Sequence, residues 1–266
     1  MNLTLLEHWP NWAIFVIFPA ASLTLMFAFT AAFRLAVKRS RFFEFDAETV
    51  NTTIQNTISG AYVVLGFVLV LVMSTANEID ANNTKEASYI ESLDRLLVME
   101  GSTAAKNARQ SLHAYTASIV NVDWDRLVDG IYRPETRALA NMLFNHINAI
   151  QINNNRQQAI FSEIIQTQNK IIEYRNLRIL SSQSQLPTLF WTLSFLTLLG
   201  IILVSAFQLT DASRKRAAAL SLQLTILSWL FAVVMILDLP FVGEHKISPV
   251  AFERALHLMQ LNSQAD

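Results

Sequence analysis

The chain has 266 residues, of which 52% are hydrophobic and 15% charged, and its formal net charge is −1. The charged fraction lies well below the roughly 25% of ordinary soluble domains, and the near-neutral balance gives no indication of a nucleic-acid partner. Because the sequence has no cysteine, disulfides, thiol nucleophiles and thiolate metal sites are excluded.

Four uncharged apolar runs account for the low charge. They contain no Asp, Glu, Lys, Arg or His and cover residues 12–33, 57–76, 186–210 and 217–237. A helix needs about 20 apolar residues to cross a bilayer, and helix is the form in which a lone segment satisfies its own backbone there. We therefore predict an all-α integral membrane protein with four transmembrane helices in contact with the lipid bilayer. Residues 1–76 and 186–237 would form its two transmembrane hairpins.

The first run does not have the form of a cleavable signal peptide. A signal peptide has a basic n-region and an apolar stretch of about 7–15 residues. Residues 1–11 contain no Lys or Arg, and the apolar run that follows is longer. Pro19 can kink this helix without ending it, because neighbouring helices can satisfy the freed carbonyl.

The long polar insert, residues 77–185, is typical of a helical bundle. Its first part has an apolar seam with steps of three and four residues, formed by Ala105, Ala108, Leu112, Tyr115, Ile119 and Val122. No Pro or Gly interrupts residues 77–100, so we expect one helix from the second span to about Asn121. Pro134 suits the first position of the next helix, and the Asn run 153–155 would interrupt the pattern. We predict an antiparallel bundle continuous with the flanking spans.

The C-terminal segment, residues 238–266, reads as a turn followed by a short amphipathic helix. Pro240 and Gly243 favour the turn, and Ser248 and Pro249 resemble an N-cap and a first-turn proline. The apolar face of the helix consists of Phe252, Ala255, Leu256 and Met259. We expect this helix to dock on the bundle or on the membrane surface rather than to bind a partner.

Basic residues in the short loops predict the orientation of the chain. The loop after the first span carries Arg34, Lys38, Arg39 and Arg41, and the loop between the third and fourth spans carries Arg214, Lys215 and Arg216. The positive-inside rule then places both termini and the insert outside. In a bacterium this means the periplasmic side of the inner membrane.

The sequence shows no catalytic constellation. HExxH, GxSxG, Walker and GxGxxG patterns are missing, and the five histidines form no close pair. Asp123, Asp125 and Asp129 lack the Gly and distal Glu of an EF-hand loop, so capping and solvation are their expected roles. We therefore predict no enzyme activity, no cofactor and no metal site.

Several polar and small residues allow more than one interpretation. Glu78, Asp80 and Glu86 follow the second span and would form either a solvated helix face or a ring of acids at a pore mouth. Asp238 ends the fourth span, where it would cap a turn or serve a function at the membrane boundary. Two stripes favour close helix packing over pore lining: Ser59, Val63, Gly66, Val70 and Met73 in the second span, and Ser221, Thr225 and Ser228 in the fourth.

A set of motifs spread over nearly the whole chain resembles the bacterial bestrophin-like membrane proteins, a domain-of-unknown-function group. The matching motifs, in chain order, are Glu86-Ala87 with Arg95; Tyr115 with Trp124; Arg178 with Leu186-Pro187 and Trp191; and Asp238-Leu239-Pro240-Phe241-Val242-Gly243 with Ser248-Pro249. Each motif is weak alone, and their common order makes the set fairly specific.

The resemblance implies a likeness to bestrophins, which are oligomeric anion channels with four spans and a helical extramembrane body. Two features of this sequence depart from bestrophins. The acidic calcium-binding cluster is missing, and the basic loops place the helical body outside, whereas that of bestrophins is cytosolic. The side of the membrane on which the insert lies therefore stays open.

Two functions from different classes fit these patterns. The first is a homo-oligomeric channel or pore for small ions, with Glu78, Glu86, Arg95 and Asp238 at its mouth or coupling the bundle to the membrane. The second is a membrane sensor or scaffold. Because only short loops would lie inside the cell, a sensor would have to act through a partner membrane protein.

Overall fold

The computed structural model describes residues 10–39, 47–124, 127, 134–182, 186–211, 213–238, 241 and 246–264. Within these ranges all regular structure is helical. The α-helices are α1 (Asn11–Arg39), α2 (Ala47–Glu100), α3 (Thr103–Ser118), α4 (Pro134–Asn148), α5 (Asn155–Ser182), α6 (Thr188–Gln208), α7 (Arg214–Leu237) and α8 (Val250–Gln264). A π-helix, η2 (Ile119–Asp123), extends α3, and a 3-10 turn, η4 (Leu209–Asp211), follows α6.

Four of these helices are long and apolar enough to cross a membrane, as the sequence predicts. They cover Trp12–Ala36, Gln55–Glu100, Thr188–Gln208 and Arg214–Leu237, and their most apolar windows have mean hydropathies of 2.1 to 2.2. The all-α fold with four candidate membrane spans that the apolar runs predict is therefore confirmed. The second of these stretches is longer than a bilayer requires, because α2 continues past its apolar run into a polar half.

The chain divides into two compact units, which we call the span unit and the bundle unit. The span unit consists of Met1–Ser74 and Gln185–His245, and the bundle unit consists of Thr75–Ser184 and Lys246–Asp266. The division falls inside α2, so each unit contains a part of that helix. The C-terminal helix α8 belongs to the bundle unit, although both α6 and α7 lie between it and the rest of that unit in the sequence.

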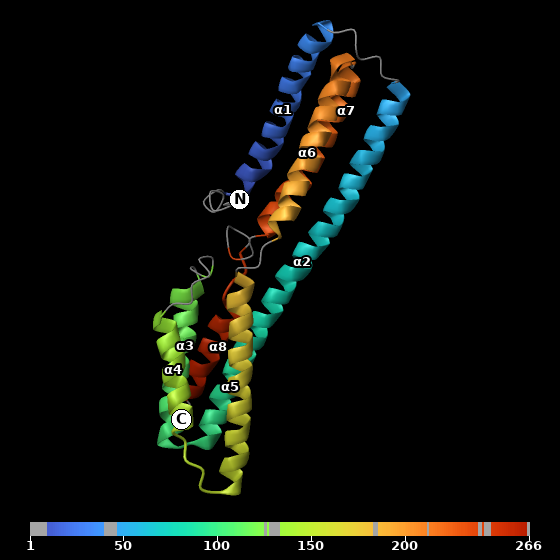
Figure 1. Ribbon diagram of the computed structural model, residues 1–266. Helices are drawn as coiled ribbons and strands as arrows, with labels where there is room; N and C mark the ends of the chain where they lie inside the picture. The colour runs from blue at the N-terminus through green and yellow to red at the C-terminus, as the bar shows by residue number, and fades with distance from the viewer. Residues whose placement is uncertain are drawn as a thin grey trace. The chain divides into compact units, whose positions relative to one another are not determined.

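Aromatic side chains form the centre of the span unit. Phe231 of α7 packs against Phe18, Trp191 and Phe195, with ring centroids 5.7, 5.9 and 5.3 Å apart. These contacts join α7 to α1 and to α6, and Figure 1 shows the three helices running alongside one another. Offset and edge-on ring packing of this kind contributes about 0.5–1.5 kcal/mol per pair beyond burial.

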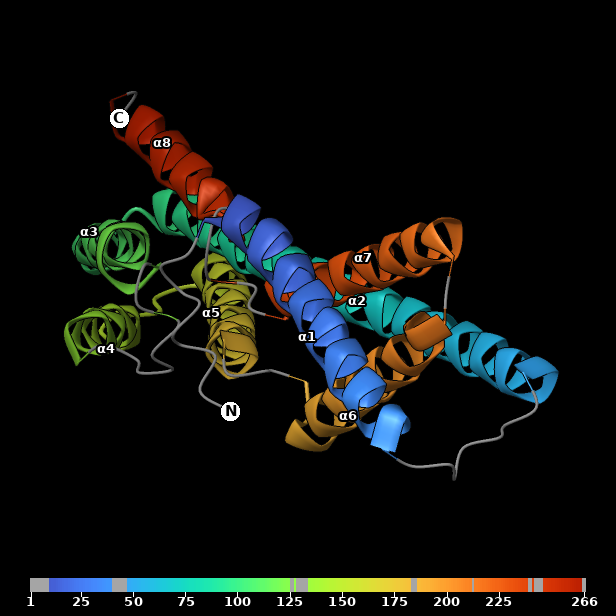
Figure 2. The same cartoon turned by 90° about the horizontal axis from the view of Figure 1, so that it is seen from above.

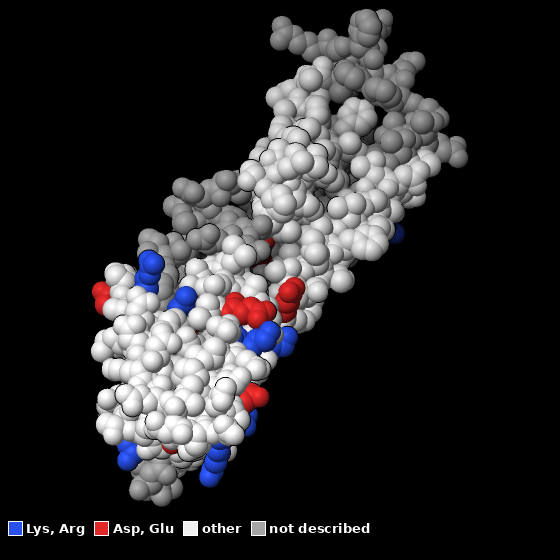
Figure 3. Space-filling view, turned by 60° about the horizontal axis from the view of Figure 1, so that its bottom comes forward, with Lys and Arg blue, Asp and Glu red and all other residues white. Residues whose placement is uncertain are grey.

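The bundle unit packs one apolar stripe from each of its helices into a common core. The fully buried side chains include Ile90 and Leu93 of α2, Leu112 of α3, Leu143 and Ile147 of α4, Ile164 of α5 and Phe252 of α8. Helices α3 and α4 contact each other, and Figure 2 shows them side by side, nearly end-on. On the face drawn in Figure 3 the charged side chains gather over the bundle helices.

The structure breaks the predicted long helix at Gly101. Helix α2 ends at Glu100, Gly101 adopts a positive φ of 75°, and Ser102 caps α3 by accepting a hydrogen bond from the Ala105 amide at 3.1 Å. The prediction of one helix to about Asn121 is therefore wrong. Its seam is nevertheless buried from Ala105 to Ile119, and only Val122, 40% exposed, lies outside the core.

The other breaks in the insert lie where the sequence predicts them. Helix α4 begins at Pro134 and ends at Asn148, and α5 begins at Asn155, so the Asn run separates the two helices. In α8, Phe252, Ala255 and Met259 are buried, and the helix contacts α3 and η2. Its predicted apolar face therefore packs within the bundle unit.

Candidate functional site

A buried ion pair lies at the centre of the bundle unit. Glu86 of α2 and Arg178 of α5 have side chains that are both 0% exposed. The Arg178 Nε donates to Glu86 Oε2 at 2.9 Å, and its Nη2 donates to Oε1 at 3.3 Å. The hydroxyl of Tyr115 on α3 also donates to Glu86 Oε1 at 3.3 Å. The Glu86 carboxylate thus connects α2, α3 and α5. Its two parallel hydrogen bonds with Arg178 need a planar guanidinium, which a lysine could not replace.

Two aromatic rings, one packed on the other, lie on one side of the Arg178 guanidinium. The ring of Phe252 on α8 lies 5.5 Å from Arg178 Cζ, and Trp124 packs on Phe252 at 5.6 Å. The Trp124 indole donates to the Ile247 carbonyl at 3.0 Å. Burial alone would lower the pKa of Arg178, but the charge and hydrogen bonds of Glu86, together with Tyr115 and Asp123, outweigh it and raise that pKa, so the guanidinium stays protonated.

A second buried carboxylate, Asp123, ends the π-helix η2. It is 4% exposed, and the Thr136 hydroxyl of α4 donates to its Oδ1 at 2.9 Å. Burial raises the pKa of Asp123, against the opposing effects of the Thr136 hydrogen bond and the Arg178 charge. Asp123 therefore ties η2 to α4 in the core rather than facing solvent as expected. Asp125 and Asp129 lie outside the described residues.

A third buried carboxylate, Asp94 of α2, was not selected from the sequence. Arg109 Nε donates to its Oδ1 at 2.8 Å, His113 Nε2 lies 3.4 Å from the same oxygen, and the Asn262 amide donates to Oδ2 at 3.4 Å. Burial raises the pKa of Asp94, but the hydrogen bonds from these residues and the Arg109 charge more than compensate and lower it. This carboxylate joins α2, α3 and α8.

In the span unit, Asp238 connects the end of α7 to the start of α6. It is 4% exposed, and it accepts hydrogen bonds from the Leu186 amide at 2.8 Å and from the Trp191 indole at 3.0 Å. Pro187 follows Leu186 directly and precedes α6. Phe241 is also buried. The motif residues Pro240 and Gly243 lie outside the described residues.

The structure separates the residues that the sequence grouped by chain position. Glu78 and Asp80 are exposed, whereas Glu86 is fully buried, so the three do not share one helix face. Arg95 is exposed and bonds Ser92 on its own helix at 3.2 Å. Of the remaining motif residues, Ala87 is buried next to Glu86, Ser248 is exposed and Pro249 is half-buried.

The arrangement of the buried residues gives the motifs a physical meaning. Glu86, Tyr115, Trp124 and Arg178, up to 92 positions apart, meet in one network in the bundle unit, and Leu186, Trp191 and Asp238 meet in another in the span unit. Within the described ranges, no three His, Asp or Glu side chains lie close enough to hold a metal ion. The networks join helices, and their atoms face one another rather than an open surface.

A chain whose described regular structure is all helical, with four helices long and apolar enough to cross a membrane, belongs to the class of helical membrane proteins. The family model of the Bestrophin-like domain matches residues 16–252, and the chain therefore belongs to the Bestrophin-like family. This confirms the resemblance carried by the motifs. The comparison with curated proteins found no match, and neither did the comparison with solved structures.

Proposed function

We propose that the chain forms a homo-oligomeric channel for small ions in a bacterial inner membrane. One observation carries the proposal: the α2 stripe (Ser59, Val63, Gly66, Val70 and Met73) is exposed along its whole length. The opposite side of the same helix, with Leu65, Val68 and Val72, is buried in the span unit. Within the part of the chain that the structure describes, the stripe therefore has no packing partner.

The small residues of the α2 stripe support a neighbour other than lipid. A Cβ added at Gly66 would meet no atom within 4 Å, so nothing inside the chain requires a glycine there. Glycine in a helix costs about 1 kcal/mol relative to alanine, and small residues in membrane helices typically allow close approach of a second helix. A ring of copies whose α2 stripes surround a common axis would account for both features.

The polar half of α2 supplies charges for the mouth of such a channel. Glu78 and Asp80 are exposed just beyond the span. In an oligomer that brings the α2 helices together, these carboxylates would form a ring that attracts cations and repels anions. Glu86 and Asp238, which the sequence also suggested for the mouth, would not lie there, because both are buried and join helices. We assign them a role in holding the bundle and the span unit in their folded forms.

Contact between the ends of the first and third spans supports the proposed orientation. Arg34, at the end of the first span, donates to the carbonyls of Leu209 and Thr210 at 3.0 and 3.2 Å. The basic end of α1 and the end of the third span thus lie together in the span unit, which fits a cytoplasmic placement of both. A reporter fused after residue 264 tests it. Periplasmic activity is expected, and cytoplasmic activity would reverse the orientation in favour of that of bestrophins.

Electrical recording from purified protein in planar bilayers tests the channel itself. We expect discrete currents above those of empty bilayers, and a lower cation preference in the Glu78→Gln/Asp80→Asn variant. Glu163→Gln, which neutralises an exposed carboxylate on α5, is the matched control and leaves selectivity unchanged. The absence of current under varied ions and pH would overturn the proposal.

Cysteine variants test whether α2 faces a wet axis. Because the chain has no cysteine, Val70→Cys creates a single thiol. A water-soluble, charged thiol reagent should modify Val70→Cys and block the current. Leu196→Cys is the matched control, because Leu196 on α6 is 59% exposed and Val70 is 66% exposed. Leu196 is not part of the α2 stripe, so the reagent should leave its thiol unmodified. Equal protection of both thiols, or isolation of the chain with a different membrane protein in fixed ratio, would favour a sensor or scaffold.

A further inference from the structure

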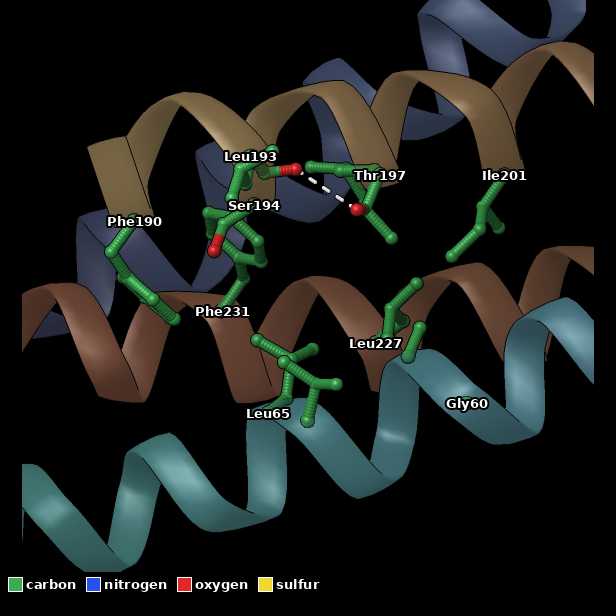
Figure 4. A pocket seen from close by; sticks show the side chains of 12 residues that line it. Gly60, Leu65, Phe190, Leu193, Ser194, Thr197, Ile201, Leu227 and Phe231 are labelled. Carbon is green, nitrogen blue, oxygen red and sulfur yellow. Dashed lines mark hydrogen bonds between the residues drawn. The ribbon is translucent and has the colours of Figure 1, made fainter. Parts of the chain in front are cut away.

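A pocket of about 300 Å³ lies in the span unit between α2, α6 and α7. Figure 4 shows side chains of all three helices around one space. No charged residue lines it, and only Ser194 and Thr197 bring polar side-chain atoms to its wall. The Thr197 hydroxyl donates to the Leu193 carbonyl of its own helix at 2.9 Å. The wall therefore offers a ligand almost only hydrocarbon.

The lining residues place the pocket at the depth of the bilayer's hydrocarbon. On α6 they extend from Phe190 to Ile201, and on α7 they are Leu227 and Phe231, near the middle of Arg214–Leu237. Lipid head groups and water lie about 15 Å from the middle of a bilayer whose core is about 30 Å thick. A polar ligand in the pocket would have no partner for its charges.

The pocket has an exposed rim and a buried floor. Gly60, Val64 and Leu193 are exposed at its edge, whereas Leu198 and Leu227 are buried at 6% and 1% exposure. Gly60 has no side chain, and a Cβ built there meets no atom within 4 Å, so this edge of the pocket is open. An empty space at this edge would cost the lining its dispersion contacts, and acyl chains are what a bilayer supplies at the edge of a membrane helix.

We infer that the pocket binds one acyl chain of a bilayer phospholipid, inserted between α2 and α6. The uncharged wall, the depth and the open edge all select hydrocarbon, and the head group would remain at the membrane interface. The site does not depend on the proposed channel, because none of its lining residues belongs to the α2 stripe.

Photocrosslinking in vesicles of phosphatidylcholine carrying a mid-chain diazirine tests the inference. In the wild type we expect adducts on the floor residues Leu198 and Leu227, in addition to adducts on the lipid-exposed Leu196. Gly60→Leu fills the edge of the pocket and should reduce the floor adducts to background while sparing Leu196. Gly200→Leu is the matched control, because a Cβ at Gly200 also meets no atom within 4 Å and Gly200 does not line the pocket.

Each outcome of this experiment is decisive. Floor adducts that survive Gly60→Leu, or that never exceed background in the wild type, would overturn the inference. A disulfide dimer of Gly60→Cys, formed on oxidation in the same vesicles, would show that a second subunit lies at the pocket instead. Gel filtration of each variant in detergent confirms that it is folded. Channel currents without floor adducts, or floor adducts without currents, separate this inference from the proposed function.

Discussion

Replacing Glu86 by Gln should strongly destabilise the bundle unit. The substitution keeps the shape of the side chain but leaves the Arg178 guanidinium buried without its counter-charge. Both side chains are 0% exposed, and breaking a buried pair from one side costs about 3–5 kcal/mol. At about 2–4 °C per kcal/mol for a domain of 150–250 residues, Tm should fall by about 6–20 °C. Thermal unfolding followed by circular dichroism in detergent measures this shift.

Two further variants distinguish a buried pair from a general effect of substitution. Glu86→Leu/Arg178→Leu removes both charges, and it should recover most of the stability that Glu86→Gln loses, because no unpaired charge remains. Glu173→Gln breaks the ion pair with Lys170, in which both side chains are about half exposed, and it should change Tm little. A Tm of Glu86→Gln equal to that of Glu173→Gln, or a double variant less stable than the single one, would refute the reasoning.

Three other predictions concern the remaining buried polar groups and the helix break. Asp238→Ala leaves the Leu186 amide and the Trp191 indole without their acceptor, and we expect a loss of about 1–3 kcal/mol per unsatisfied group, seen as a lower Tm and altered Trp fluorescence; unchanged values would contradict the network. The folded-state pKa of Asp94 is lowered, so its stabilisation is present above the unfolded value of about 3.9 and is lost as the pH falls through the folded value. The stability difference between wild type and Asp94→Asn should therefore shrink in acid, and a pH-independent difference would argue against the shift. Gly101→Ala forces a side chain into the left-handed region and should cost about 1–2 kcal/mol, measurable in the same melts, whereas a neutral effect would mean that the break relaxes.

The apolar runs predicted the spans because their signal is local. About 20 uncharged apolar residues suffice to specify a membrane helix, and no distant partner is needed. Pro134 and the Asn run marked helix ends for the same reason. The break at Gly101 was missed because the seam from Ala105 to Ile119 has the same helical period whether it belongs to one long helix or to a second helix after a break. The pair Gly101-Ser102, a left-handed position followed by an N-cap, was the signal available in the sequence.

The buried networks could not be predicted in the same way, because their members lie far apart in the chain. Glu86 was grouped with Glu78 and Asp80, which are its neighbours in sequence. Its spacing from Ile79 and Ile90, by seven and four residues, already places it on the buried face of α2. The identity of its partner, Arg178, depends on how α5 packs on α2, which no local pattern encodes. The same holds for Asp94: its neighbours Leu93 and Leu97 place it on the buried face of α2, but its partners on α3 and α8 could not be read from a local pattern.

The position of α8 has a consequence for the order in which the protein is made. Phe252 covers the Arg178 guanidinium, and Asn262 donates to Asp94, yet the ribosome produces these residues only after the last span. Chains are synthesised at about 5–20 residues per second, so several seconds pass between the synthesis of Arg178 and that of the helix that covers it. Completion of the bundle must therefore follow synthesis of both transmembrane hairpins, and translation through residue 262 is its last step.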